Sequence, residues 1–467
     1  MNKQKNKIHP GGKGYMKLDS LHRVYFVGIG GIGMSAIARY FNQKGIKVSG
    51  YDRTETALTK QLSAEGMEIH YADDVQLIDS KADLVVYTPA IPADHKELNY
   101  YREQGYEVVK RSDVLQEITR NLFSITVAGT HGKTTVSTMI AQILRHSGYG
   151  CNAFLGGISV NYESNFWGDE RAVAVIEADE YDRSFLKLSP DIALLTSIDA
   201  DHLDIYGTKE SIEEAFIQYC HNIKPNGTLL VKYGLHRDED LKAENKLHYS
   251  LQNDMADSYA TNIRMDNGGY EFDVMQQDWM IDNLKLNIGG MHNVENAVAA
   301  ITVAHLLGIS NDKIRAAVAA FKGIKRRFEY LVKNEKAVYI DDYAHHPEEL
   351  KSLINSAITL FKGKRCTVIF QPHLFSRTRD FADEFADSLS LADEVILLPI
   401  YPARELPIPG ISSKTIASKM KDTDVKIMER DEVPRWIAEH PVELLITAGA
   451  GNVDLLREPL QEIVSKQ

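Results

Sequence analysis

The most informative segment of the chain is Ala128-Gly-Thr-His-Gly-Lys-Thr-Thr135. It follows an apolar run at residues 124–128 with strand character and precedes residues 133–146, where apolar positions recur at helical spacing. A glycine-rich turn between a strand and a helix presents backbone N–H groups to phosphate. Lys133 can neutralise β- and γ-phosphates, and the Thr134 hydroxyl can bind Mg²⁺. The stretch therefore predicts a nucleotide-binding α/β domain.

This turn departs from the strict P-loop pattern, GxxxxGK[ST]. The pattern would place its first glycine at Val127, whereas the chain has Gly129 instead. We therefore expect a loop of different geometry that still binds a nucleotide; the alternative is a bare helix cap. The residues of the turn that we predict to surround ATP are Gly129, Thr130, His131, Gly132, Lys133, Thr134 and Thr135.

Acidic residues end two further strand-like runs downstream of the turn. The two stretches are Val175-Ile-Glu-Ala-Asp-Glu180 and Ser197-Ile-Asp-Ala-Asp-His-Leu-Asp204. Because the carboxyl ends of parallel strands meet at one edge of a sheet, we expect these side chains beside the ATP turn. Carboxylates there suit a metal ion, and a solvated acidic turn is the alternative.

A second glycine turn, Gly28-Ile-Gly-Gly-Ile-Gly33, lies nearer the start of the chain. It follows a predicted strand at residues 23–27 and precedes a predicted helix at residues 34–43, which favours a bound diphosphate. Asp52 ends the next predicted strand, where an acidic side chain often meets a ribose. The pattern does not distinguish NAD from UDP, and a tight structural turn is the alternative interpretation.

Strand-like and helix-like runs alternate along the chain, which predicts an α/β fold. With 467 residues, and about 150 residues in an ordinary domain, three domains are expected. We predict a flexible tail at residues 1–20 and domains at residues 21–121, 122–325 and 326–467. A β-rich stretch at residues 259–288 and two helices after it complete the middle domain.

Composition limits the class of protein. Apolar residues make up 44% and charged residues 25% of the chain, as in soluble globular proteins. The net charge of −12 argues against a general affinity for nucleic acid or anionic membranes. Three widely spaced cysteines, and the lack of an apolar run long enough to span a bilayer, lead us to expect a cytoplasmic protein.

Four motifs occur in the order found in Mur ligases, which the chain resembles over everything after the tail. They are Ala128-Gly-Thr-His-Gly-Lys-Thr, Glu177-Ala-Asp-Glu, Asp201-His-Leu-Asp and Gly290-Met-His-Asn-Val-Glu-Asn-Ala. The resemblance implies a Rossmann-like UDP-binding domain, a P-loop-type ATP-binding domain and a C-terminal Rossmann-like domain. It also implies that ATP phosphorylates a substrate carboxylate and that an amine then attacks the acyl phosphate, with Mg²⁺ or alternatively Mn²⁺ as the ion.

The resemblance further implies the residues of the site. The catalytic set is Lys133, Glu177, His202, Arg327 and His346, and the metal set is Thr134, Glu177 and His202. Outside the turn, the ATP set is His292, Asn293, Asn296, Arg327 and Asp342. The UDP-substrate set is Gly28, Gly30, Gly31, Gly33, Asp52, Thr88 and Ala90, and the amino-acid set is His373, Arg377 and Arg379. A capped core helix and a surface cluster of arginine and aspartate are the alternatives for residues 292–296 and for the C-terminal cations.

Finer similarity concerns the substrates. The continuation of the first glycine turn, Gln371-Pro-His, and Phe216 in place of a modified lysine resemble the family member that adds L-alanine to UDP-N-acetylmuramate. That reaction makes a precursor of peptidoglycan. The runner-up is the recycling ligase, which adds L-Ala-γ-D-Glu-meso-diaminopimelate to the same sugar and which Tyr181 resembles equally.

Two hypotheses come from other classes of protein. A nicotinamide-dependent oxidoreductase would use the first glycine turn, but the ATP turn would then lack a purpose. A catalytically silent nucleotide-binding regulator would not need the intact Lys133, Glu177, His202 and Arg327. For a ligase we expect ATP, UDP-N-acetylmuramate and L-alanine as binding partners, and a monomer or weak homodimer.

Overall fold

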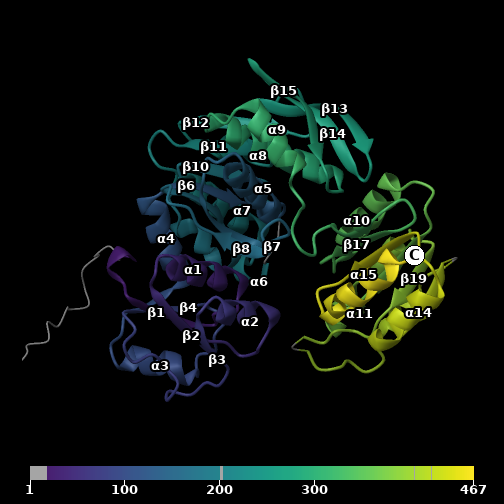
Figure 1. The fold of residues 1–467 in the computed structure, drawn as a ribbon, viewed down its shortest axis with the longest axis horizontal. Coiled ribbons are helices and arrows are strands. Elements are labelled where there is room, and N and C mark those ends of the chain that lie inside the picture. Colours follow the sequence, from purple (N-terminus) through teal and green to yellow (C-terminus); the bar gives the residue numbers. More distant parts are fainter. Residues whose placement is uncertain (1–17, 200–202, 404, 422) are drawn as a thin grey trace, which may run out of the picture.

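The structure is a computed structural model that describes residues 18–199, 203–403, 405–421 and 423–467. Within these residues the strands form three sheets, which follow one another along the chain. Figure 1 shows the N-terminal sheet below the central one and the C-terminal sheet to their right. The α/β class predicted from the sequence is confirmed. The predicted tail lies almost wholly outside the described residues, and the predicted domain boundaries stay predictions.

The N-terminal sheet is parallel and has the strand order β3-β2-β1-β4-β5. Its central strand β1 (Arg23–Val27) is buried on both faces, which explains its nearly continuous apolar run. Because β2 and β4 flank β1, the glycine turn after β1 lies where the strand order reverses, the usual ligand-binding edge of such sheets. The other elements are η1 (Leu18–Ser20), β2 (Lys47–Tyr51), β3 (Glu68–His70), β4 (Leu84–Tyr87), β5 (Val108–Lys110), α1 (Ile32–Gln43), α2 (Ala57–Ala64), α3 (Lys96–Glu103) and α4 (Arg111–Asn121).

The central sheet has ten strands in the order β15-β14-β13-β12-β11-β10-β6-β9-β7-β8. Strand β6 (Phe123–Ala128) pairs in parallel with β9 (Val173–Glu177) and β10 (Ile192–Leu195), so their carboxyl ends share one edge, as predicted. The remaining strands are β7 (Asn152–Ser159), β8 (Ser164–Trp167), β11 (Thr228–Lys232), β12 (Asn245–Ser250), β13 (Ser258–Asp266), β14 (Gly269–Gln276) and β15 (Trp279–Leu286). The last three form the antiparallel meander at the top of Figure 1.

Helices cover the central sheet on both sides. Helix α5 (Lys133–His146) follows β6 with the predicted bounds, and it packs against α8 (Met291–Leu306) and α9 (Asn311–Ala319). Helix α8 has an apolar sequence nearly all round because it is buried between its neighbours. The shorter elements here are η2 (Tyr181–Lys187), α6 (Leu203–Tyr206), α7 (Lys209–Cys220) and η3 (Asp238–Asp240).

The C-terminal sheet has the order β16-β17-β21-β18-β19-β20, in which only the edge strand β16 (Glu329–Lys333) is antiparallel. The ends of β17 (Val338–Asp342), β18 (Cys366–Phe370) and β21 (Leu444–Ala448) therefore lie together. The other elements are β19 (Glu394–Leu397), β20 (Asp424–Ile427), α10 (Pro347–Leu360), α11 (Phe375–Asp380), α12 (Ala382–Leu389), α13 (Ser413–Ala417), η4 (Arg430–Glu432), α14 (Val433–Glu439), η5 (Asn452–Leu456) and α15 (Arg457–Ser465).

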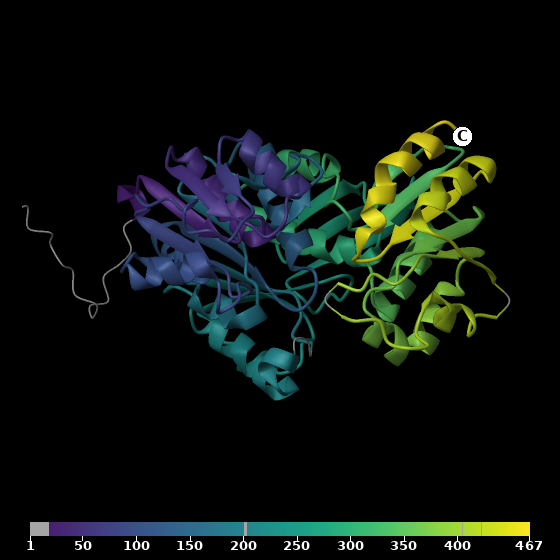
Figure 2. The same ribbon diagram turned by 90° about the horizontal axis from the view of Figure 1, so that it is seen from below.

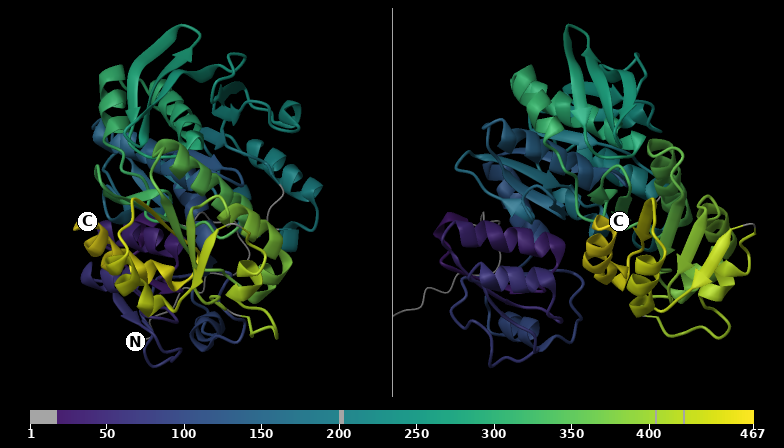
Figure 3. Two further views of the ribbon diagram at one scale, coloured as in Figure 1. Left: turned by 90° about the vertical axis from the view of Figure 1, so that its right-hand side faces the viewer. Right: turned by 45° about the vertical axis from the view of Figure 1, so that its right-hand side comes forward.

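The three parts of the molecule contact one another unequally. Helix α1 lies against β7 and β8, and Arg39 on α1 donates to Asn165, a fully buried residue. The C-terminal sheet meets the central one through the segment before β16 and through Tyr330, whose hydroxyl donates to Gly268 O at 2.6 Å. Figure 2 and the right-hand view of Figure 3 show the same arrangement, with the first two sheets together and the third to one side. In the described part of the chain, none of the helices is both long and apolar enough to cross a membrane.

Candidate active site

The turn after β6 is packed tightly against the end of β10. Gly129 has a φ of +128°, and a Cβ there would lie 2.1 Å from Thr196 Oγ1, so only glycine fits. His131 N donates to Ser197 Oγ at 2.8 Å, which fixes the middle of the turn. Gly132, at φ +81°, then starts helix α5. Both glycines have a positive φ, which favours glycine at these two positions of the turn.

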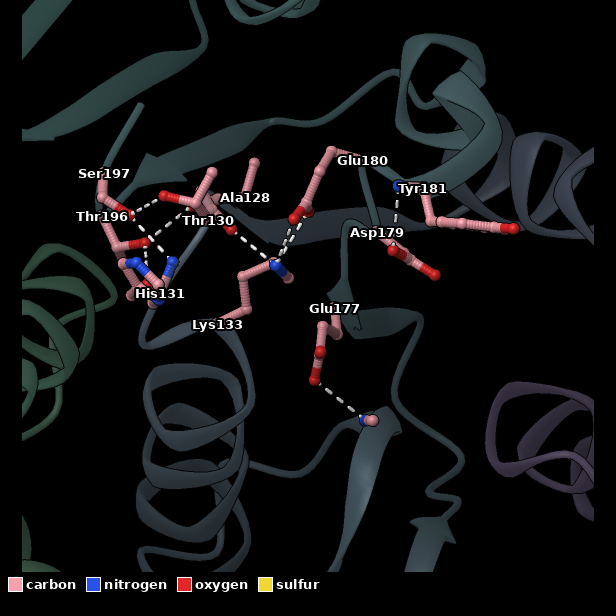
Figure 4. A network of polar contacts seen from close by, with 12 residues as sticks. Ala128, Thr130, His131, Lys133, Glu177, Asp179, Glu180, Tyr181, Thr196 and Ser197 are labelled. Atoms are coloured by element: carbon pink, nitrogen blue, oxygen red, sulfur yellow. Dashed lines mark hydrogen bonds and ion pairs between the residues drawn. The ribbon is translucent and has the colours of Figure 1, made fainter. Parts of the chain in front are cut away.

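Lys133, the first residue of α5, lies back across its own turn (Figure 4). Its ammonium donates to Gly129 O at 2.6 Å and to Glu180 Oε1 at 2.8 Å, and the side chain is only 13% exposed. Gly129 and Glu180 thus hold the ammonium at the mouth of the turn. A phosphate must compete with the Glu180 carboxylate for this ammonium, because both are anions.

Glu177, at the end of β9, faces the same helix start. Its carboxylate accepts hydrogen bonds from Thr134 Oγ1 at 3.0 Å and from Gly156 N at 2.9 Å. Burial raises the pKa of Glu177, while the nearby charges of Lys133 and Arg327 lower it. The hydroxyl and carboxylate oxygens fit a hard cation such as Mg²⁺. His202, the third predicted metal ligand, lies outside the described residues.

Three residues of the predicted ATP set, His292, Asn293 and Asn296, lie at the start of α8, and Asn296 reaches the turn. The Asn296 carboxamide oxygen would lie 3.0 Å from a Cβ on Gly132, so α8 and the ATP turn are adjacent. Asn296 Nδ2 donates to Asn293 Oδ1, and Asn293 Nδ2 donates to Gly289 O at 2.6 Å. Asn293 therefore fixes the start of α8, whereas His292 is exposed there. Of the remaining turn residues, Thr130 is buried and Thr135 is half-buried.

The N-terminal glycine turn is shaped by its neighbours in the first sheet. Gly28 has a φ of +89°, and a Cβ on it would lie 3.0 Å from Thr88 Cγ2, which places Thr88 against the turn. Gly30 N donates to Asp52 Oδ2 at 2.7 Å. Asp52 is thus bound to the turn itself, where the sequence led us to expect a side chain near a ribose. Gly31 and Ala90 are exposed beside it.

Arg111 is a residue that the sequence did not single out. It begins α4, and its guanidinium lies over the first turn of α1, because a Cβ on Gly33 would be 2.3 Å from Arg111 Nη1. The same guanidinium lies 3.2 Å from Asp179 Oδ2, two residues beyond Glu177. Arg111 therefore connects the N-terminal turn with the acidic loop of the ATP turn. Only the fold reveals it, since no local pattern marks a cation 78 residues after the turn that it serves.

Arg327 is exposed and lies between the central and C-terminal sheets. Its positive charge lowers the pKa of both Glu177 and Asp342, which places the guanidinium near carboxylates of two sheets. Asp342 ends β17 and accepts hydrogen bonds from Phe328 N at 2.6 Å and Ala344 N at 2.7 Å. Burial nevertheless raises the pKa of Asp342 to about 6.

The predicted residues Asp342 and His346 belong to a segment, residues 341–346, whose side chains point in different directions. Successive side chains of a strand point to opposite faces, so Asp341 and Asp342 have different surroundings. Asp341 is fully buried and accepts a hydrogen bond from the Thr447 hydroxyl. His346 caps α10, with its backbone N donating to Glu349 Oε2 at 3.1 Å. His345, which the sequence did not single out, lies beside one of the predicted amino-acid residues. The centroid of its ring is 6.0 Å from that of the His373 ring.

The predicted amino-acid residues divide into an inner pair and an outer residue. His373 stacks on Tyr401 with ring centroids 5.8 Å apart, and burial together with the charge of Arg377 lowers its pKa. Arg377 is half-buried, and its Nη1 has no hydrogen-bond partner among the described residues. Arg379 instead points outward and pairs with Asp380 at 2.7 Å.

Comparison with known families supports one assignment along the whole chain. The description "Mur ligase family, catalytic domain" matches residues 23–122 and "Mur ligase middle domain" matches residues 127–304. "Mur ligase, glutamate ligase domain" matches residues 326–451. The three matched segments correspond to the three sheets.

Individual relatives agree. The chain is 47% identical over 460 residues to the UDP-N-acetylmuramate–L-alanine ligase of Cytophaga hutchinsonii, covering 96% of this chain and 97% of that protein. It is 48% identical to the corresponding ligase of Phocaeicola vulgatus, over 94% and 97% of the two chains. The crystal structure of UDP-N-acetylmuramate-alanine ligase from Thermotoga maritima has a TM-score of 0.81 at 27% identity, covering 95% of this chain and all of that one. A murein peptide ligase from Psychrobacter arcticus has the same fold, with a TM-score of 0.66 at 22% identity over 96% of this chain and 99% of that one.

Proposed function

The chain belongs to the Mur ligase family, and from that premise we propose that it joins L-alanine to the lactyl carboxylate of UDP-N-acetylmuramate. ATP drives the reaction and becomes ADP and phosphate, and the product is a precursor of peptidoglycan. The observation that carries the choice of substrates is the 47% identity to the L-alanine ligase of Cytophaga hutchinsonii over nearly the full length of both chains.

The chemistry proceeds in two displacements. A carboxylate oxygen attacks the γ-phosphorus of ATP and ADP leaves, which gives an acyl phosphate. The amine of L-alanine then attacks the acyl carbon, loses a proton, and phosphate leaves with the former carboxylate oxygen. Both steps bring anions together, so the protein must supply positive charge and fixed geometry more than a nucleophile of its own.

For ATP, we propose that Lys133 and the backbone of the turn after β6 bind the phosphates. Thr134 and Glu177 would hold Mg²⁺ together with His202, and the ion would neutralise phosphate charge. This is supported by the 3.0 Å contact between the Thr134 hydroxyl and the Glu177 carboxylate. Arg327 would approach the γ-phosphate from the C-terminal sheet. The residues that we propose for the rest of ATP are His292, Asn293, Asn296, Asp342 and His346.

For the UDP-sugar, we propose that the amides at residues 28–33 and the Arg111 guanidinium bind the diphosphate. The position of Arg111 over Gly33 supports this, because guanidinium groups bind phosphate with paired hydrogen bonds. Asp52, Thr88 and Ala90 border the same turn and would contact the nucleoside or the sugar.

For the amino acid, we propose that Arg377 and His373 bind the carboxylate of L-alanine. Arg377 Nη1 is buried without a hydrogen-bond partner among the described residues, so a carboxylate would satisfy it. Arg379 would have to leave Asp380 to take part. A cytoplasmic location and a monomer or weak homodimer stay predictions from the sequence.

An acceptor screen tests the proposed function. Phosphate release would be followed with ATP, Mg²⁺ and UDP-N-acetylmuramate, adding L-alanine, glycine, L-serine or L-Ala-γ-D-Glu-meso-diaminopimelate in separate reactions. We expect the highest kcat/KM with L-alanine and no release when any one substrate is omitted. Faster release with the tripeptide would instead identify a recycling ligase, and release that needs no UDP-sugar would refute both ligases.

A further inference from the structure

The turn that carries Arg327 is strained. Its two neighbours, Arg326 and Phe328, have φ values of +62° and +46°, in the left-handed region that residues other than glycine rarely adopt. An aromatic residue in this region is a clear outlier, and such conformations persist only where the surrounding structure enforces them. Contacts on both sides of Arg327 enforce this turn.

Backbone groups on both sides of Arg327 are bound by fixed acceptors and donors. Arg326 N donates to Glu329 Oε2 at 2.7 Å, and Phe328 N donates to Asp342 Oδ2 at 2.6 Å. Tyr343 N donates in turn to Arg326 O at 2.7 Å. These bonds hold the two flanking peptides, so the Arg327 side chain must project from the tip of the turn.

The Arg326 side chain turns the opposite way and enters the C-terminal sheet. Its Nη2 donates to Gly449 O, and its Nε lies 3.7 Å from Asp341 Oδ2. Its Nη1 lies 3.9 Å from Asp454 Oδ2, and its guanidinium lies 5.0 Å from the centre of the Tyr343 ring. The side chain is only 16% exposed and reaches the ends of β17 and β21 together.

The partners of Arg326 are themselves fixed. Asp341 is fully buried and also lies 3.2 Å from Arg457 Nε. Arg457 Nη2 donates to Glu329 Oε2 at 2.6 Å, and Glu329 is the carboxylate that binds Arg326 N. Arg326, Asp341, Arg457 and Glu329 thus form a closed network, which we call the Arg326 clamp.

The clamp lies on one side of the junction between two sheets. Immediately before it, Lys325 N donates to Ile158 O of β7 at 2.9 Å, and Ile324 pairs with Ser159. The peptides on either side of Arg327 are bound by Glu329 and Asp342 of the C-terminal sheet. Arg327 N itself donates to Ile324 O at 3.2 Å. The C-terminal sheet therefore fixes the peptides that flank Arg327, while Glu177, whose pKa the Arg327 charge lowers, belongs to the central sheet.

We propose that Arg326 is a positioning residue: its clamp holds the strained turn so that Arg327 projects toward Glu177 and the γ-phosphate of bound ATP. The inference rests on the proposed function, which assigns Arg327 to that phosphate. Arg326 itself touches no substrate. Its whole contribution to catalysis should accordingly pass through Arg327.

A double-mutant cycle tests this dependence. Arg326→Gly is the first variant, because glycine adopts the left-handed backbone without strain and only the guanidinium contacts are lost. We expect kcat to fall roughly 10- to 100-fold, since a misplacement of about 1 Å can have that effect. The KM for L-alanine should change less than about twofold, because none of the four clamp residues contacts His373, Arg377 or Arg379 in the described part of the chain. In an Arg327→Ala background, Arg326→Gly should cause no further loss of kcat.

Arg237→Gly is a matched control. Arg237 also has a positive φ, of +57°, and also pairs with carboxylates, but it lies near η3, away from the site. Its kcat should equal that of the wild-type protein. If the losses from Arg326→Gly and Arg327→Ala multiply, or if Arg326→Gly has wild-type kcat, the positioning role is wrong.

Arg326→Lys provides a second cycle that makes a smaller change. Its ammonium can keep one partner but cannot reach Gly449, Asp341 and Asp454 as a planar guanidinium does. We expect an intermediate kcat, again with no further loss in the Arg327→Ala background; a multiplied loss would overturn the proposal. All variants would be assayed with whichever amino acid the wild-type protein uses. An acceptor other than L-alanine would refute the proposed function, but the double-mutant cycle would still show whether Arg326 acts through Arg327.

Discussion

The two glycine turns of the molecule begin alike and acquire their positive charge differently. Each follows a buried parallel strand, β1 or β6, and each opens a long helix, α1 or α5. The central turn carries its own cation, because Lys133 is the first residue of α5. At the N-terminal turn that position is Ile32, and the cation is Arg111 from the start of α4.

This difference explains why the two turns differ in how clearly the sequence identifies them. A cation within the motif is visible in the sequence, whereas a cation brought by another element is visible only in the fold. The turns are also linked, because the acidic loop after β9 holds both cations: Asp179 pairs with Arg111 and Glu180 pairs with Lys133. We therefore expect each substrate to compete with a protein carboxylate for its cation.

The largest expected effect is that of Lys133→Ala. Removing the ammonium should lower phosphate release roughly 10²- to 10³-fold, because the transferred phosphoryl group loses a fixed positive charge. Binding of UDP, measured by calorimetry, should stay within about twofold of wild type if the two turns bind different substrates. Lys209→Ala, on the surface of α7, is the control. Full turnover by Lys133→Ala would refute the role of the central turn.

A smaller effect is expected for Arg111→Ala. Loss of one charge-assisted contact to the diphosphate should weaken UDP binding about tenfold or more, while the affinity for uridine, which has no phosphate, should not change. Arg120→Ala, at the other end of α4, should bind UDP normally. Equal losses for UDP and uridine would show that Arg111 supports the fold of the turn and does not bind phosphate.

The smallest effect on catalysis, and a clear effect on stability, is expected for Glu97→Gln. Behind the N-terminal turn, Tyr25 donates to Glu97 at 2.6 Å, and burial raises the pKa of Glu97 to about 7. The folded protein therefore holds the Glu97 proton more tightly than the unfolded chain does. This contribution to the free energy of unfolding is complete below about pH 4.5 and is lost as the pH rises through about 7. In the strand behind the central turn, Thr126 instead forms a hydroxyl pair with Tyr219.

Thermal melting measures this contrast. From about pH 5 to pH 7 the wild-type protein should lose about 2 kcal/mol of stability relative to Glu97→Gln, in which no carboxyl group titrates at this position. His70 Nε2 lies 3.6 Å from Glu97 Oε1, so the difference between the two profiles reports Glu97 together with its effect on this imidazole. Parallel pH profiles for the two proteins would contradict the assignment.

The elements of the fold could largely be predicted from the sequence. Strand β1 and helix α5 have the predicted bounds, because a buried strand is a short apolar run and a packed helix repeats its apolar positions. Helix α1 begins two residues before the prediction, at Ile32. Gly33 in its first turn has no side chain, and the Arg111 guanidinium occupies the space that a side chain would need.

The site could be predicted only where its residues form local patterns. Glu177 and Lys133 lie together because strand ends meet at one sheet edge, which the motif order already indicates. Arg111 and the Arg326 clamp depend on contacts between elements distant in the sequence, and no local pattern marks them. For Asp341 and Asp342 the sequence does not settle which aspartate faces the site, because that depends on which face of β17 each occupies.

One measurement tests the central claim, that ATP activates the carboxylate of the UDP-sugar. UDP-N-acetylmuramate labelled with oxygen-18 in its lactyl carboxylate would be converted with ATP and L-alanine, and the released phosphate would be analysed by mass spectrometry. An acyl phosphate places one labelled oxygen in each phosphate, because the carboxylate oxygen that attacked phosphorus leaves with it. Phosphate without label would contradict carboxylate activation and would mean that ATP hydrolysis and amide formation are separate events.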